Sequence, residues 1–172
     1  MQKLAVVHFP KINNMEINLF REKYDPGYKI IQPHITLVSP ISDISENQLI
    51  EHVASVTKDI APFSIHLTGL IKTADGHLFV QVREGNEQVI NVYDTLYSEI
   101  LSPYIPTDFP FMPHITLGFF GKNDNNTLLE KAYIEARKMN IDITCNFDCV
   151  SIIKGDGFTP AIKCKDITLQ KT

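Results

Sequence analysis

The sequence lacks any long apolar run, so nothing in it approaches a membrane span, and its N-terminal apolar stretch is too short for a signal peptide. Cysteine is scarce as well: there are 3, an odd number without the spacing of a disulfide framework. Such usage favours reduced thiols in a reducing compartment. We therefore expect a cytoplasmic protein that does not insert into a membrane.

An excess of basic charge is also absent, because 16 Lys and Arg residues face 20 Asp and Glu, giving a net charge of -4. Binding of duplex nucleic acid depends on an extended basic surface, so duplex DNA is an unsuitable partner. A local positive cleft could still hold one phosphate. The composition thus indicates a small substrate or the terminus of a nucleic acid.

No linker or low-complexity tract divides the 172 residues, of which 44% are hydrophobic. This length and composition fit one globular domain with a substantial core. We expect residues 1–172 to form a single two-lobed domain, present as a monomer.

What the sequence does contain is a pentapeptide that occurs twice. Pro-His-Ile-Thr-Leu stands at residues 33–37 and again at residues 113–117, 80 positions later. At ordinary residue frequencies, an accidental five-residue match within so short a chain has a probability of roughly one in a hundred. Two identical segments at half-chain spacing predict one site built from two halves.

Strand geometry predicts how each copy is arranged. Side chains alternate between the two faces of a strand, so His34 and Thr36 share one face while Ile35 and Leu37 share the other. The preceding proline lacks an N–H, which suits the first residue of a strand or an edge position. The apolar pair is expected in the core and the polar pair at a surface. The second copy repeats this pattern.

The rest of the chain reads as two similar units of strand, helix, His-x-Thr strand, helix and strand, followed by a last strand in a hairpin through residues 155–157. We therefore predict an α+β fold of two pseudo-symmetric lobes, each an antiparallel sheet with helices on its outer face, and a cleft between the sheets. Besides the two motifs, strands are expected at residues 3–9, 63–70, 77–83, 141–153 and 160–169, and helices at residues 12–24, 45–62, 88–101 and 128–139.

If an internal two-fold relates the motif strands, then His34, Thr36, His114 and Thr116 converge on one cleft. Imidazole titrates near neutrality, so one histidine can accept a proton from water while the other protonates a leaving oxygen. The two hydroxyls can donate hydrogen bonds to phosphate oxygens where charge accumulates. This scheme requires neither a metal nor a cofactor, and it predicts a bell-shaped pH profile with a maximum near neutral pH.

With its two His-x-Thr motifs, the chain resembles the 2H phosphoesterase superfamily, which includes 2′-5′ RNA ligase-like proteins and 2′,3′-cyclic phosphodiesterases. The segment Tyr-Asp-Pro-Gly-Tyr at residues 24–28, ahead of the first motif, is similar to a bacterial branch of uncharacterised phosphoesterases. The resemblance implies His34 and His114 as the catalytic pair, with His114 leaning toward base and His34 toward acid. The symmetry of the motifs leaves that assignment open.

The substrate implied is a nucleotide or RNA terminus bearing a cyclic phosphate, which the enzyme would hydrolyse. Two alternatives stay open: a binding module that recognises such a terminus without turnover, and RNA end joining like that of the ligase-like members. The chain lacks the Arg-Trp segment that those members have before their first motif. Its negative charge also argues against a clamp for a second RNA strand. For a lone His-x-Thr pair, ordinary surface residues would be the better interpretation.

Other candidate sites are weaker. Cys145, Cys149 and Cys164 could bind a metal with His8 or His66, but the cysteines lack the spacing of common zinc sites, and buried thiols are the favoured interpretation. The histidines outside the motifs are expected to be solvated or hydrogen-bonded. Residues that could contact phosphate or stack on a base, but that are better explained as surface lysines or core aromatics, are Lys29, Lys154, Tyr24, Tyr28, Phe111 and Phe119.

Overall fold

The computed structural model describes residues 1–13, 15–121 and 126–170, and its elements follow the predicted alternation along most of the chain. In chain order they are β1 (Lys3–His8), α1 (Met15–Tyr24), β2 (Ile35–Ile41), α2 (Glu46–Thr57), β3 (Phe63–Lys72), β4 (His77–Val82), α3 (Asn86–Leu96), the 3₁₀ helix η1 (Glu99–Tyr104), β5 (His114–Phe119), α4 (Asn126–Lys138), β6 (Asp142–Phe147), β7 (Cys149–Gly155) and β8 (Ile162–Thr168).

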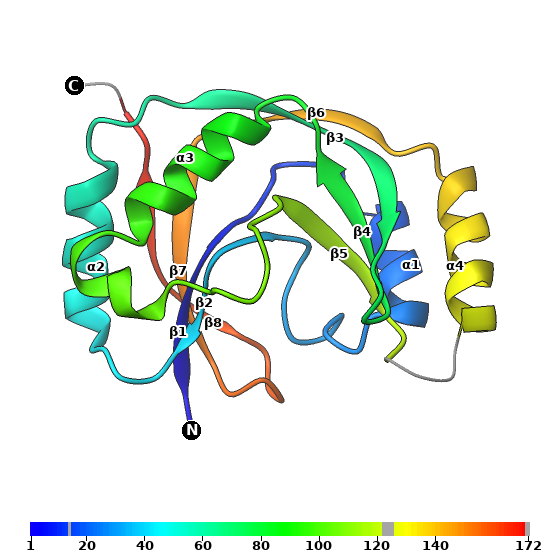
Figure 1. Ribbon diagram of the computed structural model, residues 1–172, viewed down its shortest axis with the longest axis horizontal. Helices are drawn as coiled ribbons and strands as arrows, with labels where there is room; N and C mark the ends of the chain where they lie inside the picture. The colour runs from blue at the N-terminus through cyan, green and yellow to red at the C-terminus, as the bar shows by residue number, and fades with distance from the viewer. Residues whose placement is uncertain (14, 122–125, 171–172) are drawn as a thin grey trace.

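The strands form two four-stranded antiparallel sheets, with the orders β2-β1-β7-β8 and β5-β4-β3-β6. We call them the first and the second sheet. Each His-x-Thr motif lies at the edge of its sheet, beside a central strand that starts its half of the chain. Figure 1 shows the second sheet beside α1 and α4 and the first sheet beside α2 and α3. The predicted α+β fold with two antiparallel sheets is confirmed.

One predicted strand is wrong. Residues 141–153 do not form one strand but two, β6 and β7, which are separated at Asp148 and belong to different sheets. The residues that pack in the main core change here from odd Phe147 to even Val150 and Ile152, while Ser151 and Ile153 are buried on the other face of β7. A one-residue shift turns the inward face of a strand outward. A single regular strand could not direct Phe147, Val150 and Ile152 into the same core. The sequence therefore carried a signal for a break.

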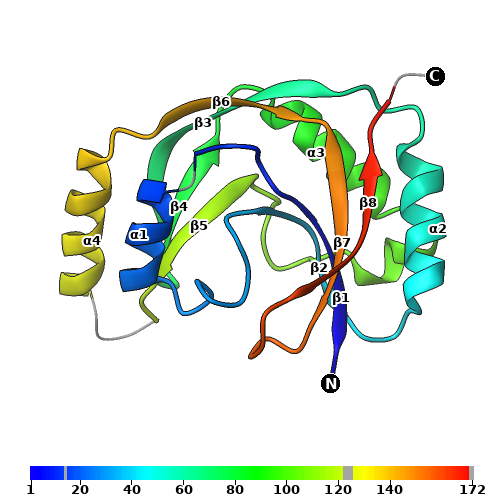
Figure 2. The ribbon, with the colours of Figure 1, turned by 180° about the vertical axis from the view of Figure 1, so that it is seen from behind.

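The two halves of the chain also exchange strands. β3, which ends the first half, pairs with β4 in the second sheet, while β7 from the second half pairs with β1 in the first sheet. The helices cross over as well: α1 packs on β5, whereas α3 packs on β2. Seen from behind, in Figure 2, the long path of β6 and β7 passes from one sheet to the other. Each lobe is thus assembled from both halves.

Three helix boundaries differ from their predicted positions by three residues or more. The first helix begins at Met15 rather than at residue 12, the helix predicted to end at residue 62 ends at Thr57, and the helix predicted to end at residue 101 ends at Leu96. At Tyr97 the backbone leaves helical geometry, and Glu99 has a φ of 46°, in the left-handed region that most residues avoid. The chain continues from there as η1. The predicted cap of α2 is present, with Ser45 and Gln48 forming a reciprocal capping box.

The core confirms the predicted faces of both motifs. Ile35, Leu37, Ile115 and Leu117 are each at most 1% exposed and belong to one continuous apolar cluster. Burying four such side chains at about 1.5–3 kcal/mol each holds the motif strands in register. Across the described residues, every helix is too short or too polar to span a bilayer.

Candidate active site

The two motif strands lie against each other where the sheets meet. β2 contacts β5, and Figure 1 shows these strands in the middle of the molecule. Unlike their buried neighbours, His34, Thr36, His114 and Thr116 are half-buried, so part of each side chain remains accessible. His114 is near enough to His34 for its charge to lower the pKa of His34. The structure therefore brings the four predicted residues to one junction.

Both imidazoles are held by the same hydrogen bond. Nδ1 of His34 lies 2.8 Å from the carbonyl oxygen of Gln32, and Nδ1 of His114 lies 2.6 Å from that of Met112. A carbonyl can only accept, so Nδ1 carries the hydrogen and donates it. In the neutral ring this fixes the tautomer and leaves Nε2 as the free acceptor. In each motif the accepting residue stands two positions earlier, with a proline between.

Burial determines the charge state of the pair. Desolvation lowers the pKa of His34 to about 4, the bond to Gln32 opposes this, and the positive charge of Arg21 lowers it further. Desolvation also lowers the pKa of His114, against the opposing effect of its bond to Met112. Both rings are thus mainly neutral at pH 7 in the free protein.

The hydroxyl groups of Thr36 and Thr116 are unengaged. Within residues 1–13, 15–121 and 126–170, neither hydroxyl forms a hydrogen bond. Each threonine lies two residues after its histidine on the same strand face. Each half of the junction therefore offers one ring nitrogen that can accept a proton and one hydroxyl that can donate a hydrogen bond.

A buried ion pair supports the segment that leads into His34. Arg21 in α1 is 2% exposed; its Nη2 lies 2.7 Å from Oδ2 of Asp25 and donates to the carbonyl of Ile31 at 2.9 Å. Oδ1 of Asp25 accepts from the backbone N–H of Gly27 at 2.8 Å. These bonds tie both ends of the segment from residue 25 to residue 31 to one helix. Sequence reasoning missed the pair, although its i, i+4 spacing is a recognisable signal.

On the first sheet, a cavity of about 320 Å³ opens beside His34 and Thr36. Small or branched apolar side chains supply most of its lining, while Lys3 and Asp156 add polar groups. The apolar residues are Ala5, Val7, Ile30, Ile31, Pro40, Ile153 and Ala161. A cavity of this size and character is typical of a site for a small organic ligand.

On the second sheet, aromatic rings occupy the corresponding place. Phe79 stacks on His114 with ring centroids 3.7 Å apart and an interplanar angle of 27°. The row continues through His77, whose ring lies 5.2 Å from Phe79 and 4.4 Å from Phe119. Phe79 thus supports the imidazole of His114 from one side. This role could not be predicted from the sequence, because Phe79 fits the pattern of any residue in an alternating strand.

Several other candidates have structural partners instead. Nζ of Lys154 lies 3.2 Å from Oε2 of Glu46, and the hydroxyl of Tyr24 donates to Oε2 of Glu135 at 2.8 Å. Phe111 stacks at 3.9 Å on a buried tyrosine, as expected for a core aromatic. By contrast, Phe119 is exposed, and Tyr28 and Lys29 line a second cavity of about 380 Å³ near Phe9.

The remaining histidines are hydrogen-bonded, as expected, whereas the cysteines are less buried than predicted. A ring nitrogen of His8 lies 2.8 Å from the carbonyl oxygen of Cys149, and one of His52 lies 2.9 Å from that of Leu96. A ring nitrogen of His66 lies 2.5 Å from Oδ1 of Asp142. All three cysteines are free, and they are half-buried rather than fully buried as predicted. No group of three or more potential metal ligands occurs within the described part of the chain.

Comparison with known proteins places this arrangement in a family. The model of the 2'-5' RNA ligase superfamily matches residues 9–158. A Bacillus licheniformis protein named "Putative phosphoesterase" is 28% identical over 120 residues, covering 67% of this chain and 69% of its own. A protein of Halalkalibacterium halodurans with the same description is 29% identical over 107 residues, covering 59% and 60%.

Among solved structures, Escherichia coli LigT complexed with 3'-AMP superposes with a TM-score of 0.65 at 16% identity, covering 99% of each chain. TT0787 of Thermus thermophilus gives a TM-score of 0.63 at 14% identity, covering 98% of each chain. At such identities the likeness establishes the fold. It agrees with the two antiparallel sheets described above.

Proposed function

Because the chain belongs to the 2′-5′ RNA ligase superfamily, we propose that it is a phosphoesterase that hydrolyses a cyclic phosphodiester without a metal. The substrate is a 2′,3′-cyclic nucleotide or an RNA terminus that bears a cyclic phosphate. The observation that carries the proposal is the matched pair of imidazoles, each held through Nδ1 by a backbone carbonyl and each left with Nε2 free. Two equivalent proton-transfer groups at one junction suit in-line displacement at phosphorus.

In this reaction a water oxygen forms a new bond to phosphorus while one ribose oxygen leaves, so a cyclic diester becomes a monoester. Nε2 of one histidine takes the proton from water, and the other histidine gives its proton to the leaving oxygen. Thr36 and Thr116 donate to the non-bridging oxygens, whose charge rises in the transition state. Each general acid or base contributes typically about 10² to 10⁴-fold.

The order of the two pKa values bears on which histidine is the acid. Burial lowers the pKa of His34 to about 4, so we expect His34 to be the ring that stays neutral when the pair carries one proton. That state has His34 ready as the base and His114 protonated as the acid. This assignment is the reverse of the one implied by family resemblance.

The two alternatives predict different behaviour. A binding module would hold the same terminus without turnover, and an end-joining enzyme would run the chemistry backward with a second RNA strand. The net charge of -4 disfavours the latter. LigT, which shares the fold, was crystallised with 3'-AMP, and this supports nucleotides as the ligands to test first. We also propose that the protein is cytoplasmic and monomeric.

The direct test is hydrolysis of adenosine, guanosine, cytidine and uridine 2′,3′-cyclic phosphates by the purified protein, with the products separated by chromatography. We expect at least one nucleotide to yield a single monoester isomer, 2′ or 3′. Binding of a product without turnover of any cyclic substrate, including short RNAs with cyclic ends, would favour the binding module instead. Ligation of RNA ends in excess of hydrolysis would favour end joining.

The assignment of acid and base needs a separate test, which uses the leaving group. A p-nitrophenyl phosphodiester expels an anion that needs no proton, so removing the general acid costs little with that substrate. We expect His114→Ala to lose less activity on it than on a cyclic nucleotide, by at least about tenfold. His34→Ala should lose activity on both substrates alike. The opposite pattern would restore His34 as the acid.

A further inference from the structure

Arginine is rare in this chain, and its three copies have different surroundings. Arg21 is buried and paired with Asp25, and Arg137 lies near the end of α4, a helix on the outer face of the second sheet. Arg83 follows directly after β4. Its side chain is exposed and forms no ion pair or hydrogen bond within the described ranges 1–13, 15–121 and 126–170. It is therefore an uncommitted guanidinium in a chain of net negative charge.

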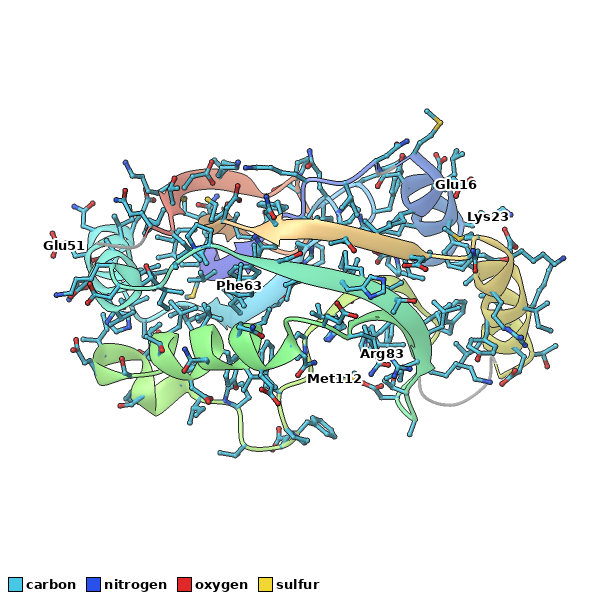
Figure 3. The ribbon with its side chains drawn as sticks, turned by 90° about the horizontal axis from the view of Figure 1, so that it is seen from above. Glu16, Lys23, Glu51, Phe63, Arg83 and Met112 are labelled. Carbon is cyan, nitrogen blue, oxygen red and sulfur yellow. The ribbon has the colours of Figure 1, made fainter. Side chains whose placement is uncertain are left out.

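Register places Arg83 on the face of the second sheet that carries the site. Gln81 pairs with His114 across β4 and β5, and its side chain contacts the sulfur of Met112 at 3.7 Å. Arg83 stands two residues further along, so it shares the face of Gln81 at a distance of about 7 Å along the strand. In Figure 3, Arg83 and Met112 lie on the side of β3 opposite Glu16 of α1.

A glycine next to this guanidinium shapes its position. Gly69 has a φ of +78° and lies in the irregular part of β3 between Leu67 and Leu70. A Cβ on Gly69 would lie 3.3 Å from Nε of Arg83, 3.4 Å from its Nη2 and 3.5 Å from Oε1 of Gln81. The guanidinium therefore rests against bare backbone, next to Gln81, while its exposed N–H groups remain available to a ligand.

We propose that Arg83 binds a second phosphate of the substrate, the one on the 5′ side of the terminal nucleotide. This inference rests on the proposed function, in which the cyclic phosphate lies between His34 and His114. A planar guanidinium with free N–H donors is well suited to bidentate phosphate binding. Along the strand, Arg83 lies about 7 Å from Gln81, the residue that pairs with His114. This distance is similar to the separation of neighbouring phosphates in a nucleotide chain. The preferred substrate is then a 5′-phosphorylated nucleotide or an oligonucleotide, not a cyclic nucleoside monophosphate.

The test compares ligands that differ in this phosphate alone. By calorimetry, the wild-type protein should bind adenosine 3′,5′-bisphosphate about 10- to 100-fold more tightly than adenosine 3′-monophosphate. Arg83→Ala should abolish this preference, and Arg83→Lys should keep part of it because a point charge remains. Arg137→Ala, which removes the same charge from the outer surface, should leave the preference unchanged.

Turnover provides the second arm, with adenosine 2′,3′-cyclic phosphate, its 5′-phosphorylated form and a cyclic-ended dinucleotide. The ratio of kcat/KM for each larger substrate to that for the smallest should fall about 10- to 100-fold in Arg83→Ala. An effect on the dinucleotide alone would identify the internal phosphodiester as the group recognised. Equal binding of the two adenosine phosphates by the wild type overturns the inference, even if hydrolysis occurs. Failure of hydrolysis with the binding preference intact overturns only the proposed reaction.

Discussion

The two sides of the junction have the same reactive groups but different surroundings. Val7 pairs with Thr36 in the first sheet, and Phe79 holds the equivalent position opposite Thr116 in the second. Two residues earlier along the central strands, Ala5 corresponds to His77. Small side chains leave the cavity of about 320 Å³ beside the first motif, whereas aromatic rings fill that place beside the second.

This difference separates two requirements that a symmetric site cannot meet together. The reacting phosphate needs two opposed proton-transfer groups, which the repeated motif provides in matched form. The nucleoside has no such symmetry and needs a cavity on one side only. We therefore expect the nucleoside to lie in the cavity on the His34 side and the packed aromatic side to hold His114 in a fixed orientation.

The largest expected effect comes from removing either reactive ring. His34→Ala and His114→Ala should each lower kcat for the cyclic substrate by about 10² to 10⁴-fold, because each loses one proton transfer. The double variant should be only slightly worse than the worse single one, since the two rings act as a unit. His66→Ala, whose ring lies against Asp142 of β6 and not at the junction of the two motif strands, serves as a control. Full activity in either single variant would remove the shared-site model.

The second prediction makes the two sides more alike. Val7→Phe should fill much of the cavity beside His34, raising KM by about tenfold while kcat changes little, because contacts to the nucleoside are lost without disturbing the reactive rings. The reciprocal change Phe79→Val should lower kcat by loosening His114, and it should also lower the free energy of unfolding by about 1–3 kcal/mol. Steady-state kinetics and thermal unfolding measure both. A fall in kcat alone for Val7→Phe would place the nucleoside elsewhere.

The third prediction concerns pH. The base must be neutral, so kcat/KM falls as pH drops through the pKa of His34, about 4; the acid must be protonated, so kcat/KM falls again as pH rises through the lowered pKa of His114. The maximum for the free enzyme should therefore lie below pH 6.5, more acidic than the neutral maximum expected from sequence. A pH series of initial rates at low substrate concentration measures it. A rate that climbs steadily to pH 10 would indicate hydroxide attack without a general acid.

The smallest expected effect is that of chelation. Because the motif pairs imidazole with hydroxyl groups, which are poor ligands for a zinc site, EDTA should leave kcat/KM unchanged within about twofold. The protein should be dialysed against the chelator before the assay. If chelation abolished activity and added Zn²⁺ or Mn²⁺ restored it, the reaction would require a metal ion, and the metal-free proton-transfer scheme would be wrong.

Periodicity alone predicted the features that depend on local burial. The inward faces of both motifs, the cap at Ser45 and most strands follow from side-chain alternation and capping chemistry, which act over a few residues. The exchange of β3 and β7 between sheets does not, since alternation records that a strand is buried and not which strand it pairs with. The single strand predicted over residues 141–153 failed for this reason, although the burial shift around Asp148 was visible in the sequence.

For the site, the repeat identified the four side chains but not their supports. The carbonyls of Gln32 and Met112 belong to the backbone, so no residue type could reveal them. The contact of Phe79 with His114 depends on the pairing register of β4 with β5, which is a long-range property. Arg83 became informative only when its lack of a partner among the described residues was known. These are all relations between distant segments, which a linear pattern does not contain.

The pairing of β1 with β7 has a consequence for how the protein acquires its shape. Lys3 pairs with Gly155 and Val7 with Ser151, so β1 waits for β7, which is synthesised much later, before its sheet is complete. Ile153, which lines the cavity beside His34, arrives with that late strand. Closing such long loops is entropically costly and slows folding. The cavity beside His34 is therefore completed late, and a nascent chain presents it only after β7 has emerged.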